Sequence, residues 1–255
     1  MSPPTGAVKQ FGSAHPLRSV PYTLPAPKVV LCDLDGTLID SMPILADLAT
    51  DVMEEVYGTP RVLARELYVA TCGLPFFRQL ESIFPRDLRN PDAADRFEAR
   101  KPDRCDQLRM SVDVERALQD LKRRGVAVVV SSNNGLANVA AFARQAGFAF
   151  DLVLGFGDGL AKGAPHIDRA ATELHVERSQ MLFVGDSLHD GEIAEAERIG
   201  FVGVAGTFSY ERFTLRFPHL PVIRRFSDLP SLLFAEWSQA SEASSSSSRV
   251  LAGRG

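Results

Sequence analysis

The chain has 255 residues, 45% of them hydrophobic, which is enough for one large domain or for one domain that carries an insert. Its 32 acidic residues outnumber its 28 Lys and Arg, so the formal net charge is −4 and no basic surplus indicates a nucleic-acid partner. The three cysteines, Cys32, Cys72 and Cys105, are too few and too scattered for a disulfide framework or a Cys-based zinc site.

The two ends of the chain differ in composition from the middle. Residues 1–27 hold six prolines and little apolar periodicity, and residues 236–255 include the run Ser244–Ser248. Such segments cannot bury enough apolar surface to order themselves, so both are predicted to be disordered. No apolar run approaches the ~20 residues that cross a bilayer, and the N-terminal segment has no apolar stretch typical of secretory signals. We therefore expect no membrane partner and a cytoplasmic location.

Short apolar runs, rich in β-branched residues, alternate with stretches of helical spacing. The predicted strands are residues 28–32, 126–130, 152–154, 181–184 and 201–204. Each run is continuous rather than alternating, as expected for strands buried on both faces of a parallel sheet. The helical patterns run up to Gly125, Gly147 and Gly200, and glycine is typical of a left-handed helix end. We therefore predict a doubly wound α/β fold.

One connection is too long for this scheme. About 90 residues separate the first predicted strand from the second, far more than one crossover needs. Residues 42–106 contain helical patterns and no convincing strand. We predict that they form an inserted helical cap over one end of the sheet, while residues 28–41 and 107–235 form a discontinuous core.

Two acids follow the first predicted strand directly, in the segment Asp33-Leu-Asp35-Gly-Thr37. Ligands of open α/β sheets bind outside the carboxyl ends of strands, and residues i and i+2 of an extended chain point to the same side. Two converging carboxylates repel each other unless a cation lies between them, and Mg²⁺ suits such oxygen ligands. A calcium loop is excluded because Leu38 and Ile44 stand where Gly and Glu are needed, whereas a plain polar turn stays open.

A second acidic pair strengthens the case for a site. The predicted strand 181–184 leads into Gly185 and Asp186, and Asp190 follows four residues later. Residues i and i+4 share one face of a helix, so Asp186 could complete a metal site from a neighbouring strand while Asp190 supports it through water. The simpler alternative is that Asp186 or Ser187 only caps the following helix.

Two further segments could bind an anion. The predicted strand 126–130 runs into Ser131 and Ser132, followed by Asn-Asn-Gly, which places hydroxyls and free backbone N–H groups at a strand end. Such a cluster suits a phosphate, although most are plain turns. Lys162, one of only five lysines, precedes a predicted helix. A surface position is usual for a lone lysine, but here it could steady both a phosphate and a nucleophile.

In this order of acids, serine, lysine and acids, the chain resembles the haloacid dehalogenase superfamily of phosphohydrolases over residues 28–235. The segments Val30–Leu38 and Gly185–Asp190 carry most of the resemblance, with Ser131 and Lys162 between them. The helical insert after the first segment is similar to that of the helical-cap subfamily, to which phosphoglycolate and sugar-phosphate phosphatases belong.

The resemblance implies Mg²⁺-dependent hydrolysis of a small phosphorylated metabolite through an aspartyl-phosphate. Asp33 is then the nucleophile, and Asp35 is the general acid and base, whose presence favours phosphate chemistry over carbon–halogen cleavage. Three groups would bind the metal: Asp33, the main-chain carbonyl of Asp35 and Asp186, with Asp190 behind them. Three side chains would hold the phosphate oxygens: Ser131, Ser132 and Lys162.

Other functions remain open from the sequence. A phosphosugar mutase of the β-phosphoglucomutase type would use the same residues, and so would a binding protein that has lost activity. A non-catalytic signalling module with a phosphorylated Asp is disfavoured, because there the acid pair lies on a separate strand and no such insert occurs. Arg61, Arg65 and Arg78 of the cap could pair a substrate carboxylate, although a solvated helix surface is the simpler interpretation. Both a monomer and a homodimer are possible.

Overall fold

The structure is a computed structural model that describes residues 26–105 and 107–234. Apart from Ala26 and Pro27, the terminal segments predicted to be disordered lie outside the described residues. Within residues 26–105 and 107–234, no helix is both long enough and apolar enough to span a membrane.

A parallel sheet forms the centre of the molecule, and its strand order is β3-β2-β1-β4-β5-β6. The strands are β1 (Val29–Cys32), β2 (Ala127–Gly135), β3 (Leu152–Phe156), β4 (Met181–Gly185), β5 (Gly200–Val204) and β6 (Val222–Ile223). The strand order reverses between β1 and β4, and a doubly wound sheet opens a crevice at the carboxyl ends of such a pair. The predicted α/β fold is therefore confirmed.

The continuous apolar runs are explained by burial on both faces. Along β1, Val29 and Leu31 join the hydrophobic cluster on one face, and Val30 and Cys32 join the cluster on the other. All four side chains have no exposed surface. The sixth strand, β6, was not predicted because two residues are too short to show a pattern.

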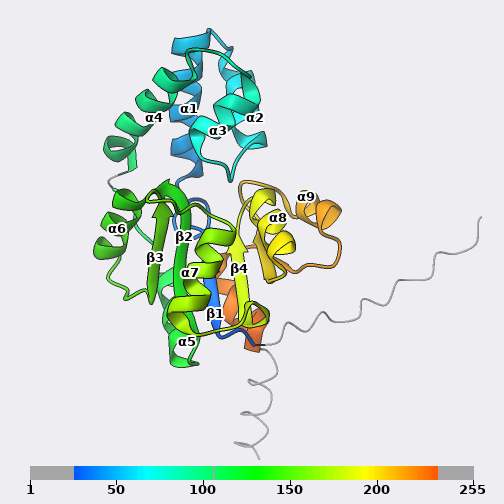
Figure 1. The fold of residues 1–255 in the computed structure, drawn as a ribbon. Helices are drawn as coiled ribbons and strands as arrows, with labels where there is room; N and C mark the ends of the chain where they lie inside the picture. Colours follow the sequence, from blue (N-terminus) through cyan, green and yellow to red (C-terminus); the bar gives the residue numbers. More distant parts are fainter. Residues whose placement is uncertain (1–25, 106, 235–255) are drawn as a thin grey trace, which may run out of the picture.

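Helices cover both faces of the sheet (Figure 1). They are α5 (Val112–Arg123), α6 (Leu136–Gln145), α7 (Ala164–Leu174), α8 (Leu188–Glu197) and α9 (Tyr210–Arg216), with the short 3₁₀ helices η1 (Arg178–Gln180) and η2 (Phe226–Asp228). Gly125 and Gly147 have the expected positive φ, 77° and 65°. The prediction for Gly200 is wrong: α8 ends at Glu197, Arg198 takes the left-handed conformation (φ 56°), and Gly200 begins β5.

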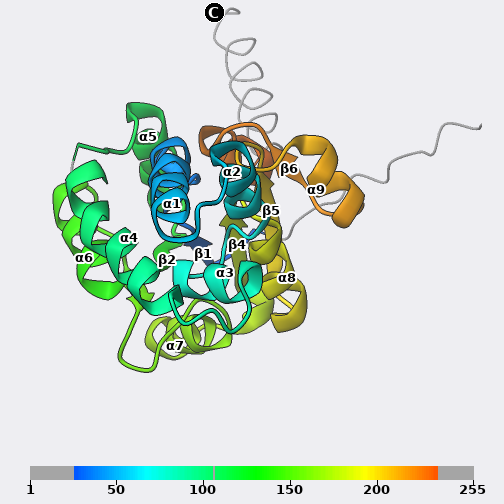
Figure 2. The same ribbon diagram turned by 90° about the horizontal axis from the view of Figure 1, so that it is seen from above.

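The connection between β1 and β2 contains the predicted helical insertion. Its helices are α1 (Met42–Tyr57), α2 (Arg61–Ala70), α3 (Phe76–Ile83) and α4 (Asn90–Cys105), followed by α5, which packs against the sheet. Figures 1 and 2 show α1–α4 grouped beyond the carboxyl ends of the strands, where they cap the crevice. Tyr68, Phe76 and Phe97 form an aromatic cluster within the cap, with Phe76 and Phe97 stacked at 4.1 Å. The boundaries at residues 42 and 106 stay a prediction.

Candidate active site

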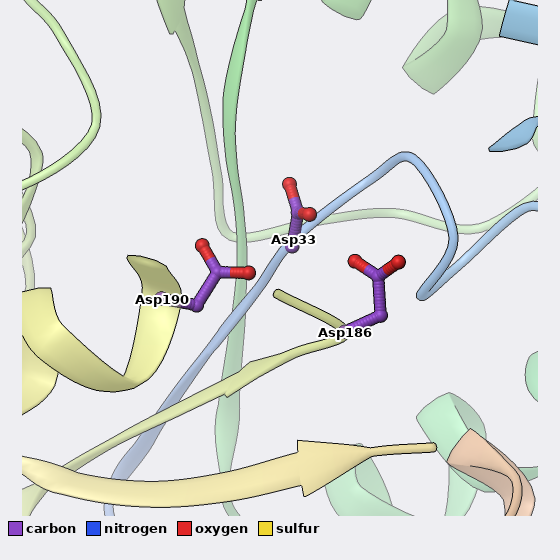
Figure 3. Close-up of side chains that lie close together, drawn as sticks. All are labelled: Asp33, Asp186 and Asp190. Atoms are coloured by element: carbon purple, nitrogen blue, oxygen red, sulfur yellow. The ribbon is translucent and has the colours of Figure 1, made fainter. Parts of the chain in front are cut away.

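Three buried carboxylates meet at the crevice where the strand order reverses. Asp33 follows β1, Asp186 follows β4, and Asp190 lies in the first turn of α8. One oxygen of each carboxylate lies within 4.8 Å of the other two, and the residues are 5%, 2% and 0% exposed. Figure 3 shows the three side chains facing one another from separate segments. The two acid-bearing segments, far apart in the sequence, therefore build one site.

Asp35 lies in the same pocket but its carboxylate has different partners. The strand ends at Cys32, and a turn follows in which the amides of Leu38 and Ile39 donate to the Leu34 carbonyl, at 3.0 and 3.1 Å. The chain is therefore not extended here as expected, although Asp33 and Asp35 both line the pocket. The oxygens of Asp35 accept hydrogen bonds from two side chains, Ser41 Oγ at 2.6 Å and Asn134 Nδ2. The metal role of its main-chain carbonyl stays a prediction.

Gly36 allows the two acidic loops to approach each other. Its φ is +78°, and a Cβ at this position would lie 2.0 Å from Asp186 Oδ2. Only glycine combines this backbone conformation with so close a contact. The carboxylate of Asp186 is also bonded by Thr37 Oγ1, which donates to Oδ1 at 3.4 Å, and by Thr207 Oγ1, which donates to Oδ2.

Lys162 is not a surface residue but lies between two of the acids. Its Nζ is 2.7 Å from Asp33 Oδ1 and 2.9 Å from Asp190 Oδ1, and its side chain is 2% exposed. Burial alone would lower the pKa of Lys162, but the charges of Asp190 and Asp33 raise it above its usual value. The lysine is therefore held as a cation beside the proposed nucleophile.

One ammonium group does not balance three buried carboxylates. Burial, with the nearby charges of Asp190 and Asp186, raises the pKa of Asp33 well above its usual value in spite of Lys162. Burial and the charge of Asp190 raise the pKa of Asp186 to about 7. Oxygen donors that resist ionisation together are the ones a hard dication favours, because it relieves their mutual repulsion. The residues present thus fit a divalent cation at Asp33, Asp186 and Asp190.

The segment after β4 combines the site with a helix cap. Ser187 is the N-cap of α8: its Oγ accepts from the Asp190 amide at 3.1 Å, and Asp190 Oδ2 accepts from the Ser187 amide at 3.2 Å. The capping alternative is therefore correct for Ser187 but not for Asp186. This N-cap of α8 also orients Asp190, whose other oxygen, Oδ1, accepts from Lys162 Nζ. Its contact with a metal through water stays a prediction.

The prediction that Ser131 binds phosphate is wrong. Its hydroxyl lies 2.9 Å from Nδ1 of His166 and has no contact with the pocket, whereas Ser132 lines the pocket. Both residues belong to β2, and successive side chains of a strand point to opposite faces, so only one of the two can face the crevice. The hydroxyl of Ser132 accepts from the Asn134 amide at 3.1 Å.

His166 gives Ser131 a structural role that depends on pH. The Gly155 carbonyl, 3.1 Å from Nε2, can only accept, so Nε2 carries the proton and Nδ1 accepts from Ser131. Burial lowers the pKa of His166 to about 4, although the bond to Gly155 opposes this. The neutral ring therefore holds the first turn of α7 against β2 and β3.

The free energy of unfolding should lose this contribution in acid. Because the folded pKa lies below the usual 6.5, the unfolded chain binds the proton more readily, and stability falls as the pH drops from about 6.5 to about 4. The expected loss is on the order of 3 kcal/mol. Urea unfolding of the wild type and of His166→Gln at pH 7.5 and 4.5 tests this, since the two should differ less at pH 4.5. An equal difference at both values would contradict it.

The cap closes the pocket over the acids. The cavity beside Asp33 has a volume of about 70 Å³, and its cap wall consists mainly of Tyr68, Leu74, Pro75, Phe76, Gln79, Phe97, Glu98 and Lys101. Asn133 connects cap and core: its Nδ2 donates to the Gly73 carbonyl at 2.7 Å, and its Oδ1 accepts from the Lys162 amide at 3.2 Å. Gly73 (φ +99°) fits so tightly that a Cβ would lie 2.6 Å from Ser187 Oγ.

Some functional residues were missed or misjudged from the sequence. Thr207 lies just beyond β5, so the rule that sites lie at carboxyl ends of strands could have found it. Ser41 gave no such signal, because a serine before a helix indicates a cap, whereas its hydroxyl donates to Asp35 instead. The three cap arginines do not line the pocket. They lie on the cap surface: Arg61 meets Asp51 and Glu54, Arg65 meets Asp47, and Arg78 lies over the Phe77 ring.

Comparisons with known proteins agree with this geometry. A family described as haloacid dehalogenase-like hydrolase matches residues 30–204. A phosphoglycolate phosphatase of Neisseria gonorrhoeae is 29% identical over 74% of this chain and 83% of its own length. One of Pectobacterium atrosepticum is 29% identical over 79% of this chain and 90% of its own. CbbY of Rhodobacter sphaeroides, solved in complex with phosphate, has a similar fold, with a TM-score of 0.61 at 19% identity over 80% of this chain and 96% of that one.

Proposed function

Because the chain belongs to the family of haloacid dehalogenase-like hydrolases, we propose that it hydrolyses a small phosphate monoester with Mg²⁺, through an aspartyl-phosphate. The observation that carries the proposal is the contact of Asp33 with Lys162 inside the group of three carboxylates. The names of the curated relatives favour phosphoglycolate as the substrate, whereas a CbbY mutant of similar fold was solved with the sugar phosphate xylulose 1,5-bisphosphate. CbbY, similar in fold, was solved with phosphate bound.

In the first step an oxygen of Asp33 attacks phosphorus, and the bond from phosphorus to the ester oxygen breaks. A carboxylate can do this at neutral pH without an activating base. Asp35 gives its proton to the departing alcohol, which contributes ~10²–10⁴-fold to the rate. Ser132, the amide groups of its loop and Lys162 hold the phosphate oxygens, because positioning and electrostatics dominate phosphoryl transfer.

In the second step Asp35 takes a proton from a water molecule, which attacks the same phosphorus and releases inorganic phosphate from Asp33. Asp35 is poised for both steps because Ser41 and Asn134 fix its two oxygens at the pocket wall. Mg²⁺ held by Asp33, Asp186 and the main-chain carbonyl of Asp35, with Asp190 behind them, would supply the positive charge that lets a carboxylate meet a phosphate dianion. The cap excludes bulk water while Asp33 carries the phosphoryl group.

Metal removal tests the proposal. Treatment with a chelator should abolish phosphate release from p-nitrophenyl phosphate, and added Mg²⁺ should restore it. Mg²⁺ at a hundredfold excess over its Kd should also raise the free energy of unfolding by about 2.7 kcal/mol, because it binds only the folded chain. This gain should increase between pH 6 and pH 8, since Asp186, with a pKa of about 7, must lose its proton to bind the ion. Turnover that survives chelation would refute the metal site.

A further inference from the structure

The charged residues that line the pocket disfavour a second anionic group beside the phosphate. Among the described residues that line it, four are carboxylates and two are cations: Asp33, Asp35, Glu98 and Asp186, and Lys101 and Lys162. Lys162 pairs with Asp33 and Asp190 and, in the proposed function, holds the phosphate. Of the residues that the structure describes on the cap side of the pocket, therefore, only Lys101 could meet a negative group on the alcohol part of a substrate.

Lys101 is already paired and hydrogen-bonded with neighbouring residues. It projects from α4 with a side chain that is 10% exposed, and its Nζ lies 3.3 Å from both oxygens of Glu98. The same Nζ donates to Asn134 Oδ1 and lies 5.2 Å from the centre of the Phe97 ring. A lysine has three N–H donors, and these contacts use them. Lys101 is thus paired before any substrate enters, with a Glu98 side chain that is 48% exposed.

A carboxylate on the leaving group would be repelled by the negative charge of the pocket wall. To reach Lys101 it must approach Glu98 as well, and like charges repel each other. Uncharged hydroxyl groups fit better, because Glu98 and Asp35 offer acceptor oxygens and Gln79 lies in the same wall. The remaining cap wall, with Tyr68 and Phe76, is apolar or aromatic and suits a carbon chain.

The structure assigns to Glu98 the choice of leaving group: by pairing with Lys101 it makes the pocket select phosphate esters of uncharged, hydroxyl-bearing alcohols over esters whose alcohol carries a carboxylate. This rests on the proposed hydrolase function and narrows its substrate class. It runs against the substrate in the names of the curated relatives, so the two can be separated by experiment.

The test compares kcat/KM for two esters of equal chain length, 2-phosphoglycolate and 2-hydroxyethyl phosphate, with Mg²⁺ present. The wild type should prefer 2-hydroxyethyl phosphate by about tenfold. Glu98→Gln frees the charge of Lys101 and should shift the ratio by about tenfold towards 2-phosphoglycolate. Lys101→Met leaves Glu98 unpaired and should shift the ratio the other way. Comparing each ratio with that of the wild type removes the intrinsic difference in reactivity between the two esters.

Glu55→Gln is the matched control. Glu55 also lies on the cap and also pairs with a cation, Arg100 at 2.7 Å, but it does not line the pocket, so the ratio should stay at the wild-type value. A wild type that prefers 2-phosphoglycolate, with a ratio that Glu98→Gln leaves unchanged, would overturn the inference. Absence of phosphate release from both esters and from p-nitrophenyl phosphate would refute the hydrolase function itself, and the inference with it.

Discussion

Asp33→Asn is expected to reduce kcat for phosphate release by at least about 10⁴-fold, because an amide oxygen cannot take up the phosphoryl group. The fold should persist, since the change is nearly isosteric and the amide oxygen can still accept from Lys162. Without metal, the variant should even gain stability at neutral pH. Burial raises the pKa of Asp33, so ionising this carboxyl in the folded chain costs free energy that an uncharged amide does not. Release of p-nitrophenol with Mg²⁺ present and urea unfolding without it measure the two effects.

Asp40→Asn provides the comparison for this variant. Asp40 lies in the same loop but is exposed and does not line the cavity beside Asp33, so its loss should leave kcat close to that of the wild type. If Asp33→Asn retained a tenth of the wild-type kcat, Asp33 could not be the nucleophile. A large loss in both variants would point to a general disturbance of the loop instead.

Lys162→Met should abolish turnover and lower the free energy of unfolding by about 3–5 kcal/mol at pH 8, the effect of removing one partner from a buried ion pair. The three carboxylates would then face each other without a cation. Asp33 and Asp186 have folded pKa values above their unfolded ones, so their contribution is favourable in acid and is lost as the pH rises through the folded values. The deficit of the variant should thus be larger at pH 8 than at pH 5.

Lys28→Met removes an exposed lysine and should change stability little at either pH. Unfolding in urea, with metal chelated throughout, gives the four free energies needed for each variant. A deficit of Lys162→Met that stays constant from pH 5 to pH 8 would show that lost packing against Phe183, 5.8 Å away, rather than lost charge, is responsible.

The parts of the fold that were predicted are those set by local burial. Runs such as the one in β4 are apolar at every position because both faces of a central parallel strand are covered, and this leaves a clear pattern. Edge strand β6 has two residues and leaves none. Gly200 shows the limit of residue preferences, because Arg198 takes the left-handed conformation at the helix end and the glycine begins β5 instead.

The candidate site was predictable where chain topology alone decides it. Asp33 and Asp186 follow neighbouring strands, so the order of the sheet brings them together regardless of side-chain detail. The choice between Ser131 and Ser132 depends on which face of β2 each occupies. A continuous apolar run does not alternate, so the sequence does not show which residues share a face. The environment of Lys101 depends on how the cap is seated, which no local pattern encodes.

The side-chain amide of Asn133 adds a free-energy cost to opening the cap. Its nitrogen donates to the Gly73 carbonyl, and its oxygen accepts from the backbone amide of Lys162. One planar amide group therefore links the cap to the core. Moving the cap away from the core would break the bond from Asn133 to Gly73, while the bond from the Lys162 amide to Asn133 lies within the core. If the cap opens to release the alcohol, the hydrogen bond to Gly73 must break first, and we expect it to slow that step.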